Sequence, residues 1–423
     1  MPFITQPSLS RDEAVALACK IEAINADPGF IRDIKDDALR RRLRDAGRSL
    51  GFAMETMVET IGRIGTAPMQ LAMARIGQEA GIFAALAEAD GRVLSHSDVA
   101  QKTVMDPILL NQFLRWYQSY DYISNPDVDG YAANDITRAL ASSAGYDGIH
   151  LYSEFKAPVF AAFPQFMREN GFQAPTDPAR CGFQLGQRTS LSAFAWLLQR
   201  PEHQGHFIRW MTGRMAGLAL WLDGFDFPGV VLGAGKQGAA GAAAETDADT
   251  VLFVDVGGAL GHNAILLRQR YPDLKGRVVV QDQASVVEQS RAAALPGHED
   301  VERQVYDFWT PQPIKGARAY YFSHIFHDWP DHKCLEILAN TMSAMTAGSV
   351  LLIDEAVVPE RRAPWLTTDL DLCMVTALAA RERTRADWEA LLARAGFEVL
   401  GIHKYQEDFE QAVIVAAPLD LAP

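Results

Sequence analysis

The stretch HIFHDWPDH, residues 324–332, holds three of the chain's ten histidines and two aspartates. Histidine titrates near neutral pH and is also a common metal ligand, so the stretch predicts either proton chemistry or a metal site. A metal site needs His324, His327 and His332 to converge. If a strand ends near residue 325 and a helix begins near residue 329, the three rings do not share one face. The two aspartates suit the N-terminus of that helix, so we expect no metal here.

A glycine turn after a buried strand is a second stretch with chemical meaning. The strand TVLFVDVGG carries Asp255 near its end, and Gly257, Gly258 and Gly261 follow. Such a turn lets a ligand approach the backbone closely and directs helix amides at it. The next strand ends at Asp282, where a carboxylate can bind two ribose hydroxyls. The spacing D-x-G-x-x-x-G favours S-adenosylmethionine over NAD as the nucleoside-bearing cofactor.

The composition excludes several classes of protein. The net charge of −14 and the pI near 5.2 argue against binding to nucleic acid or to an anionic membrane. Cys19, Cys181, Cys334 and Cys373 are widely spaced, which predicts reduced thiols in a cytoplasmic protein and no disulfide or zinc framework. We also expect no secretory signal and no membrane span, because no long apolar run occurs.

Spaced apolar residues predict that residues 1–140 form a mostly helical domain. Apolar positions recur with a helical period over residues 11–24, 31–46 and 48–120. The segment DYISNPDVDGYAA, residues 121–133, then predicts a strand, a turn and a second strand. Helices followed by a hairpin are typical of a winged helix, which would make the domain a DNA reader or a dimerisation module.

The helix starts in this domain help to choose between these two roles. DGRVLSHSDVA and MDPILLNQFL both predict a helix start, with Ser97 or Asp106 as the cap and Pro107 in the first turn. The helix over 106–120 would enter a DNA groove, yet Arg115 is its only basic residue. Reading DNA requires basic and amide side chains on that face. We therefore expect this helix to pack against a second subunit and to bind no nucleic acid.

The amino-acid composition changes twice in the rest of the chain. Residues 141–228 are rich in aromatic residues and predict a helical segment that contributes to a substrate pocket. Residues 229–250 are rich in Gly and Ala and predict a linker or insertion. Residues 251–423 alternate apolar strands with helices, one of them over 262–270. That alternation predicts an α/β domain with a parallel, doubly wound sheet.

Six motifs, in this order, resemble those of one enzyme family: FVDVGGALGH, VQDQASVVEQ, YDFWTP, IFHDWPDHKCLEIL, LLIDEAVVP and RERTRADWEALLARAGF. Over nearly its whole length the chain resembles class I S-adenosylmethionine-dependent O-methyltransferases of the caffeic-acid and flavonoid type. It is more similar still to their relatives in fungal polyketide pathways. The resemblance implies a Rossmann-like, seven-stranded methyltransferase domain, preceded by a winged-helix domain that forms a homodimer. It also implies methyl transfer, without metal, to a hydroxyl of an aromatic, polyketide-type small molecule.

The resemblance also implies a catalytic group of three residues. In this family a histidine deprotonates the acceptor hydroxyl and two glutamates hold the histidine, which by position are His327, Glu355 and Glu382. A phenol has a pKa of about 10, so little phenolate exists at neutral pH and a base helps. An unperturbed histidine is largely free to accept that proton. A glutamate on its other nitrogen fixes the tautomer and stabilises the imidazolium.

Matching the motifs also implies the residues that bind each substrate. Asp307 and Phe308 correspond to the pair that contacts the adenine, Trp329 would pack on the same ring, and Ser323 would lie near the cofactor carboxylate. The expected acceptor-binding residues are Trp210, Met211, Phe326, Asp328 and Met374. For the two methionines a purely structural role in the core stays open.

The sequence departs from the family at three places. Ala259 stands where a glycine is usual in the cofactor turn, and Ser323 stands where many plant members have a lysine. The insertion 229–250 is the third departure, and no function follows from it. Some fungal relatives bind S-adenosylmethionine without transferring its methyl group and act as pericyclases or dehydratases. That activity is the alternative, although retention of His327 and its two glutamates favours methylation.

Overall fold

A computed structural model describes residues 10–213, 217–233 and 247–419 of the chain. Most of the predicted insertion 229–250 therefore lies outside the described residues. The chain divides into two compact units, Met1–Met73 and Ala74–Pro423.

The first unit is helical. Its elements are α1 (Arg11–Ala26), α2 (Pro28–Asp33), α3 (Asp37–Met54) and the first part of α4 (Met57–Glu79). The expected helix over 11–24 matches α1, which begins with a capping box made by Ser10 and Glu13. The expected helix over 31–46 divides in two, because Asp36 caps a new helix through the backbone N–H of Leu39.

The second unit begins with the helices and hairpin of a winged helix. These elements are α5 (Ile82–Ala87), α6 (His96–Lys102), α7 (Pro107–Ser119), β1 (Ser124–Asp127) and β2 (Gly130–Ala132). Asp106 caps α7 and Pro107 is its first residue, as predicted. Ser97 is not a cap. Ser95 begins α6 because its hydroxyl and the carboxylate of Asp98 form a reciprocal capping box.

A helical segment follows the winged helix. Its elements are α8 (Asp135–Ala141), α9 (Ser143–Leu151), η1 (Tyr152–Lys156), α10 (Ala157–Glu169), α11 (Gly182–Gln187), α12 (Ala193–Leu198) and α13 (Pro201–Gly213). Buried residues of this segment form one hydrophobic cluster with residues from α17 (Trp365–Leu378), which comes from the C-terminal domain. The two parts of the chain are thus joined by a shared core.

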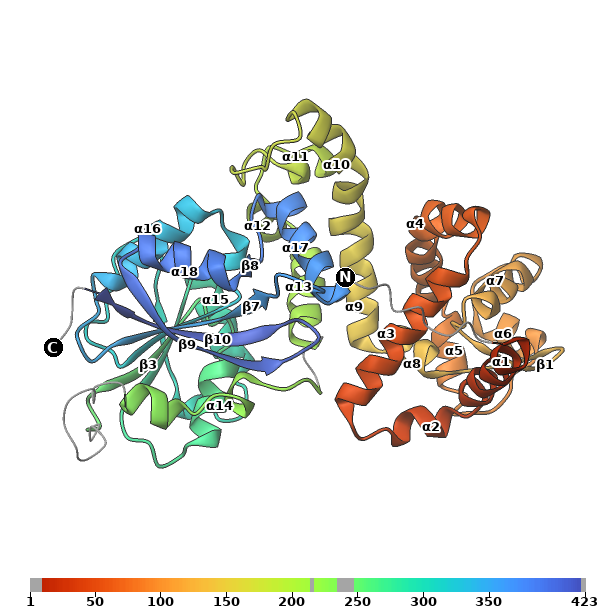
Figure 1. Ribbon diagram of the computed structural model, residues 1–423, viewed down its shortest axis with the longest axis horizontal. Helices are drawn as coiled ribbons and strands as arrows, with labels where there is room; N and C mark the ends of the chain where they lie inside the picture. The colour runs from red at the N-terminus through yellow and green to blue at the C-terminus, as the bar shows by residue number, and fades with distance from the viewer. Residues whose placement is uncertain (1–9, 214–216, 234–246, 420–423) are drawn as a thin grey trace. The chain divides into compact units, whose positions relative to one another are not determined.

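The C-terminal domain is built on one twisted sheet (Figure 1). Its strands are β3 (Val251–Val256), β4 (Arg277–Asp282), β5 (Glu302–Val305), β6 (Ala319–Ser323), β7 (Val350–Val358), β8 (Arg383–Thr384), β9 (Phe397–Gln406) and β10 (Gln411–Pro418). Seven of them follow the order β5-β4-β3-β6-β7-β10-β9, and the two-residue β8 pairs with β7. The expected sheet is parallel throughout, but β10 runs antiparallel to both neighbours because a short turn joins it to β9.

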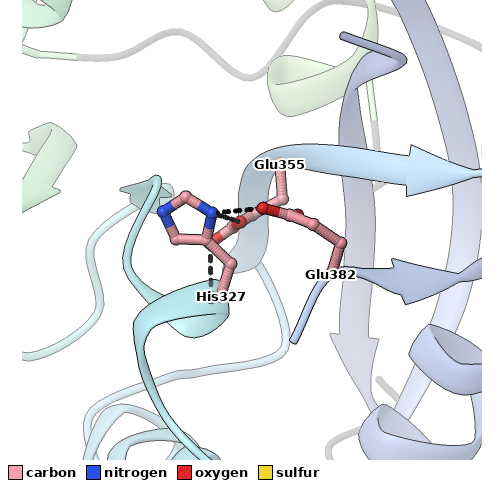
Figure 2. A group of neighbouring side chains, drawn as sticks. All are labelled: His327, Glu355 and Glu382. Carbon is pink, nitrogen blue, oxygen red and sulfur yellow. Dashed lines mark hydrogen bonds and ion pairs between the residues drawn. The ribbon is translucent and has the colours of Figure 1, made fainter. Parts of the chain in front are cut away.

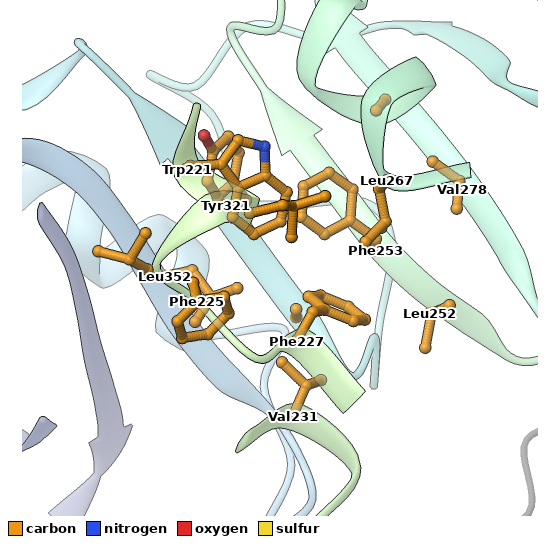
Figure 3. Packing of buried hydrophobic residues seen from close by; sticks show 14 of the residues in the cluster. Trp221, Phe225, Phe227, Val231, Leu252, Phe253, Leu267, Val278, Tyr321 and Leu352 are labelled. Atoms are coloured by element: carbon orange, nitrogen blue, oxygen red, sulfur yellow. The ribbon is translucent and has the colours of Figure 1, made fainter. Parts of the chain in front are cut away.

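Alternate residues of the central strands pack into hydrophobic layers on the two faces of the sheet. On one face, Phe253 and Tyr321 pack with Trp221 and Phe227, which come from the segment before the sheet (Figure 3). On the other face, the strands pack against α16 (Asp331–Met342) and α18 (Arg385–Arg394). The remaining elements are η2 (Trp221–Asp223), η3 (Pro228–Leu232), α14 (His262–Arg270), α15 (Ala284–Ala293), η4 (His298–Asp300) and η5 (Phe326–Asp328). The predicted helix over 262–270 has the bounds of α14.

The order of the strands predicts a ligand-binding crevice at the point where the connections between strands diverge. The connection after β3 leads to β4 on one side, whereas the connection after β6 leads to β7 on the other side, so the two connections diverge between the neighbouring strands β3 and β6. Open α/β sheets bind ligands at such a point, beside the carboxyl ends of the strands. Among the described residues, no helix has both the length and the apolar character needed to cross a lipid bilayer.

Candidate active site

The glycine turn after β3 has no room for side chains at its first two glycines. Gly257 has a φ of 72°, and a Cβ there would lie 2.6 Å from Cδ1 of Ile325. A Cβ at Gly258 would lie 2.6 Å from the carboxylate of Asp255. The turn therefore requires glycine at these two positions. Gly261, with a φ of 89°, then begins α14.

A small pocket opens beside this turn. Its lining residues are Val256, Gly257, Asp282, Gln283, Tyr306, Asp307 and Phe308. Four predicted cofactor residues thus meet in one cavity, although they come from three different strand ends. The carboxylate of Asp282 accepts hydrogen bonds from the backbone N–H of Ala259 at 2.9 Å and of Gln283 at 2.7 Å. A carboxylate has about four lone-pair positions, so Asp282 can still accept from ribose hydroxyls.

Asp255 lies beneath the turn and is 1 % exposed. Neither of its carboxylate oxygens has a hydrogen-bond partner among the described residues, although the Ala264 amide at the start of α14 lowers its pKa somewhat. Burial, together with the charges of Asp282 and Asp354, raises the pKa of Asp255 to about 8. A buried carboxylate without a partner fits a ligand that carries positive charge, as S-adenosylmethionine does at its sulfur and amino group.

Ser323 belongs to a second acidic network rather than to an anchor for a carboxylate. Its hydroxyl lies 3.4 Å from Oδ2 of Asp354, which also accepts from Tyr321 at 2.5 Å, while Tyr405 donates to Oδ1 at 2.8 Å. Burial raises the pKa of Asp354 to about 6, against the lowering effect of these hydroxyls. Negative charge therefore gathers where plant relatives would carry a lysine.

Trp329 lies in an aromatic group next to the cofactor pocket. Its ring centroid is 4.8 Å from that of Trp309, 6.3 Å from that of Phe308 and 6.2 Å from that of Phe194. The edge-to-face geometry of the first two contacts is typical of stabilising aromatic pairs. Phe194 comes from α12, so the group joins the cofactor pocket to the helical segment.

His327, Glu355 and Glu382 meet although 28 and 55 residues separate the glutamates from the histidine. Nδ1 of His327 lies 2.7 Å from Oε1 of Glu382 and 3.7 Å from Oε2 of Glu355. Figure 2 shows this nitrogen turned toward both glutamates and the other ring nitrogen turned away from them. The histidine is 3 % exposed, so water screens these contacts weakly.

Glu355 also holds the turn on which His327 sits. Its Oε1 accepts from the backbone N–H groups of Ile325, Phe326 and His327 at 2.9, 2.7 and 3.3 Å. Burial is the main cause that raises the pKa of Glu355 to about 7, and the positive charge of His327 opposes that shift. One glutamate thus fixes the backbone while the other fixes the ring.

The charges around His327 act on its proton affinity. Burial alone would lower the pKa of the imidazole, but the carboxylates of Glu355, Glu382 and Asp328 outweigh it and raise the pKa to about 10. Asp328 contributes from the other side, with Oδ1 3.5 Å from Nε2. The surrounding carboxylates therefore favour the protonated form of the ring, and the role of His327 as a base stays a prediction.

The donor atoms of His327, Glu355 and Glu382 lie within 4.8 Å of one another, a spacing that a small cation could bridge. However, Nδ1 and the nearest oxygen of Glu382 are already at hydrogen-bonding distance. We interpret the three side chains as a hydrogen-bonded group, and metal-independent chemistry stays a prediction.

Sequence reasoning missed Arg383, which follows Glu382 in the RERT motif. Its guanidinium is fully buried and donates to the carbonyl oxygens of Phe326 at 2.9 Å and Trp329 at 3.1 Å. It also pairs with Asp331 at 2.8 Å. The turn that carries His327 is thus held from both ends. An arginine next to a glutamate that is predicted to be catalytic could have suggested this role.

Of the predicted acceptor residues, one is turned away from a ligand. Phe326 is 0 % exposed and packs in the core against Phe322 and Trp388, so its side chain does not line a pocket. Trp210 lies on α13, where it packs against Gly148. Met211 is half-buried on the same helix, and Met374 is 9 % exposed within the cluster shared with α17.

The three histidines of the HIFHDWPDH stretch separate in space. His332 is exposed in the first turn of α16, as the strand-to-helix interpretation predicts. His324 has a φ of 54° and lies next to the acidic network, with Nδ1 3.1 Å from Oγ of Ser323. Its ring centroid is 5.4 Å from that of His327.

Comparisons with known proteins show which family the chain is similar to. Residues 247–398 match the O-methyltransferase domain family. The chain is 31% identical to demethylsterigmatocystin 6-O-methyltransferase of Aspergillus parasiticus, over 90% of this chain and 94% of that protein. A solved structure described as a pericyclic reaction enzyme is 30% identical with a TM-score of 0.84, over 95% and 100% of the two chains. The structure of LepI complexed with SAM is 30% identical with a TM-score of 0.82, over 97% and 100%.

The buried charge of Asp255 predicts a pH dependence of stability. Folding raises the pKa of Asp255, so its protonated carboxyl group contributes fully to stability below the pKa it has in the unfolded chain. This contribution is lost as the pH rises toward 8. Between pH 5 and pH 8, we expect the free energy of unfolding of the wild type to fall by on the order of 2 kcal/mol more than that of Asp255→Asn. Denaturant unfolding without cofactor measures this difference. The exposed Asp273→Asn is the control, and an equal difference at both pH values would contradict the prediction.

Ala259 predicts an effect of backbone strain. Its φ of 49° is in the left-handed region, which costs a residue with a Cβ about 1–2 kcal/mol. Ala259→Gly removes this cost but gives the unfolded chain more freedom, which offsets about 0.4–1 kcal/mol. We expect a net stabilisation of up to about 1 kcal/mol in denaturant unfolding. The same change at Ala390, exposed in α18, should instead destabilise by about 1 kcal/mol. Equal losses at both positions would show that Ala259 is not strained.

Proposed function

Because this chain belongs to the O-methyltransferase family, we propose that it transfers the methyl group of S-adenosylmethionine to a hydroxyl of an aromatic, polyketide-type molecule. The observation that carries the proposal is the buried group of His327, Glu355 and Glu382 beside the glycine turn. No metal takes part in the proposed reaction, because an oxygen nucleophile aligned with the methyl group suffices.

The residues of the pocket would hold the cofactor, which supplies a methyl group activated by a sulfonium charge. Gly257 offers its bare backbone, Asp282 accepts from ribose hydroxyls, and Asp307 and Phe308 contact the base. Asp255 lies buried below the turn, and a positively charged cofactor beside it would favour the ionised form of its carboxyl group. The support for this assignment is that one cavity unites these residues, and that a related chain, LepI, has been solved with SAM.

The acceptor would lie between His327 and the helical segment. Nε2 of His327 points away from the two glutamates and would meet the reacting oxygen. Trp210, Met211 and Met374 would provide apolar walls for a flat aromatic ring, with Asp328 at the polar end. A related protein that is named for methylating demethylsterigmatocystin supports an acceptor of this class. Closing such a site to water would favour transfer, because charge is neutralised in the reaction.

A second candidate function uses the same fold without methyl transfer. A structure described as a pericyclic reaction enzyme is similar over nearly the whole chain, which favours a pericyclase or dehydratase as the alternative. In that case His327 would donate a hydrogen bond to a carbonyl oxygen of the substrate. The fate of the methyl group separates the two functions.

We also propose that the protein acts as a homodimer in the cytoplasm. Helix α3 buries none of its residues, and five apolar side chains around the start of α4 are 59–78 % exposed. These are Met54, Met57, Val58, Ile61 and Ile64. An exposed apolar patch of this kind is typical of a subunit interface. The four cysteines are all free, which suits a reducing compartment.

Methyl transfer is tested with methyl-labelled S-adenosylmethionine and a panel of phenolic polyketides. We expect label in the acceptor product, an unchanged rate with EDTA, and a fall in kcat of about 10²–10⁴-fold in His327→Ala. His332→Ala, in the exposed first turn of α16, is the matched control. If an acceptor is isomerised or dehydrated while no label moves, the second candidate function is correct.

Dimerisation is tested by light scattering after gel filtration. We expect twice the chain mass of 46.5 kDa for the wild type, and the single mass for Ile61→Glu/Ile64→Glu, because two buried carboxylates would oppose association. Leu400→Glu, which changes a 52 % exposed leucine on β9, should leave the dimer intact. A wild-type mass equal to one chain would contradict the proposal.

A further inference from the structure

Two further histidines lie close together in the helical segment, outside the group around His327. His150 is on α9 and His206 is on α13, and their side chains are buried, with exposed fractions of 6 % and 7 %. Their ring centroids are 4.7 Å apart, and the ring of Tyr146 stacks on that of His150 at 4.0 Å. Because buried polar atoms normally have hydrogen-bond partners, the partners of the ring nitrogens indicate what each histidine can do.

The ring of His206 is held by an acidic partner. Its Nδ1 lies 2.6 Å from Oδ1 of Asp147, and since a carboxylate can only accept, this nitrogen carries a proton. Arg209 donates to both carboxylate oxygens of Asp147, at 2.7 and 2.9 Å. Burial alone would raise the pKa of Asp147, but Arg209 and His206 outweigh it and lower that pKa. His206 is thus fixed in one orientation against an anion.

His150 has no such partner. Its Nε2 is buried from solvent and has no hydrogen-bond partner among the described residues. Ser153, which follows in the π-helical turn η1, has a second atom of this kind, its Oγ. Residues three apart lie on one side of a helix, and π-helical turns are frequent at functional sites. Unpaired buried polar atoms cost free energy, so these two atoms indicate a ligand that supplies the missing partner.

The surroundings favour an uncharged His150. Burial lowers the pKa of this histidine, and the charges of Arg75 and His206 lower it further. Glu154 and Glu79 oppose this shift, but both are paired with Arg75. A neutral imidazole offers one N–H donor and one lone pair. It therefore suits an uncharged oxygen of a ligand, either a carbonyl group that accepts or a hydroxyl group that donates.

The two histidines border the same core as the predicted acceptor walls. Trp210 follows His206 by one helical turn on α13, so the two side chains share a face of that helix. The ring of Trp210 lies against α9 at Gly148, where a Cβ would be 2.6 Å from the ring. Trp210 also packs in the cluster that contains Met374 of α17, and α17 contacts η5, the turn that carries His327. The histidines thus border the proposed acceptor site, with its apolar walls between them and the catalytic turn.

We propose that His150 binds a second oxygen function of the acceptor, an uncharged carbonyl or hydroxyl group remote from the methylated hydroxyl. Ser153 contributes a second hydrogen bond. His206 is a positioning residue, because it is held by Asp147 and packs against the ring of His150. An acceptor with two oxygen functions on a flat aromatic frame fits this arrangement, whereas a phenol with a single oxygen leaves Nε2 unpaired. The inference rests on the proposed methyl transfer for its choice of acceptor.

Matched pairs of acceptors test the proposal during turnover. The pairs are dihydroxynaphthalenes with naphthols, and dihydroxyanthraquinones with monohydroxyanthraquinones, so that the members of a pair differ by one remote hydroxyl group. For the wild type we expect kcat/KM to be about tenfold higher for the member with the second hydroxyl, since one net hydrogen bond is worth about that factor. The difference should lie in KM. His150→Phe keeps an aromatic ring and should abolish this preference while kcat for the simpler member stays nearly unchanged.

Two further variants separate recognition from a structural role. His150→Gln keeps a hydrogen-bonding group and should retain part of the preference. His203→Gln is the matched control on α13, because it changes the 2.6 Å contact with Glu154 and should leave the preference intact. Equal kcat/KM for both members of every pair in the wild type would overturn the proposal, and so would an unchanged preference in His150→Phe.

Binding without turnover distinguishes a failure of this proposal from a failure of the proposed function. Calorimetry measures Kd for the same pairs in the presence of S-adenosylhomocysteine, which has no methyl group to transfer. If the remote hydroxyl lowers Kd about tenfold but no acceptor is methylated, the oxygen-binding site stands and the proposed methyl transfer fails. If acceptors are methylated but Kd is equal within each pair, the methyl transfer stands and Nε2 of His150 binds only a buried water molecule.

Discussion

The contact of 2.7 Å between His327 and Glu382 is the interaction on which the site depends. Both partners are buried, and removing one partner of a buried ion pair typically costs about 3–5 kcal/mol. The contact can form only if the turn after β6 and the segment before β8 are brought together. Strand β8 achieves this by pairing with the end of β7, where Val357 lies opposite Arg383. The pairing of these strands thus places Glu355 and Glu382 next to the ring of His327.

Burying so many acidic groups costs free energy, and the structure offsets this cost in two ways. Backbone amides and hydroxyls satisfy part of the charge, as at Glu355 and at Asp354. Arg383 offsets another part, with its guanidinium over the ring of Trp388 as well as on Asp331. For Asp255 the described residues offer no such compensation, and burial instead raises its pKa, so that the neutral carboxyl group is favoured. A cationic cofactor near this carboxyl group would favour its ionised form.

Local signals made much of the fold predictable. The glycine turn, the bounds of α14 and the Asp106 cap follow from neighbouring residues. Ser97 was a wrong cap because two serines compete there, and only Ser95 has an acidic residue at the spacing of a capping box. The direction of β10 was also missed, since it depends on the short turn from β9 and on pairing with β7. The resemblance to the family pointed to His327 and its two glutamates, but it gave no information on the charges around them.

The residues missed or misplaced in the site share a physical cause. Arg383 is charged and would usually be assigned to solvent, yet the carbonyl oxygens it binds belong to a turn more than 50 residues earlier in the chain. Phe326 lies next to His327 in the sequence, but successive residues of a tight turn point in different directions. Its ring therefore packs in the core, while the ring of His327 is turned toward Glu355 and Glu382. Such roles depend on burial and on which remote segments meet in the fold, and a sequence pattern gives neither.

Helix α17 connects the catalytic group with the acceptor side of the site. Asp371 on this helix accepts from the backbone of Glu382, while Cys373 and Met374 pack into the cluster of the helical segment. A thiol–carbonyl contact of 3.3 Å between Cys181 and Ala377 ties the same helix to α11. Because α17 contacts both the backbone of Glu382 and the buried cluster of the helical segment, a substitution in that cluster that displaces α17 would also displace the glutamate that contacts His327.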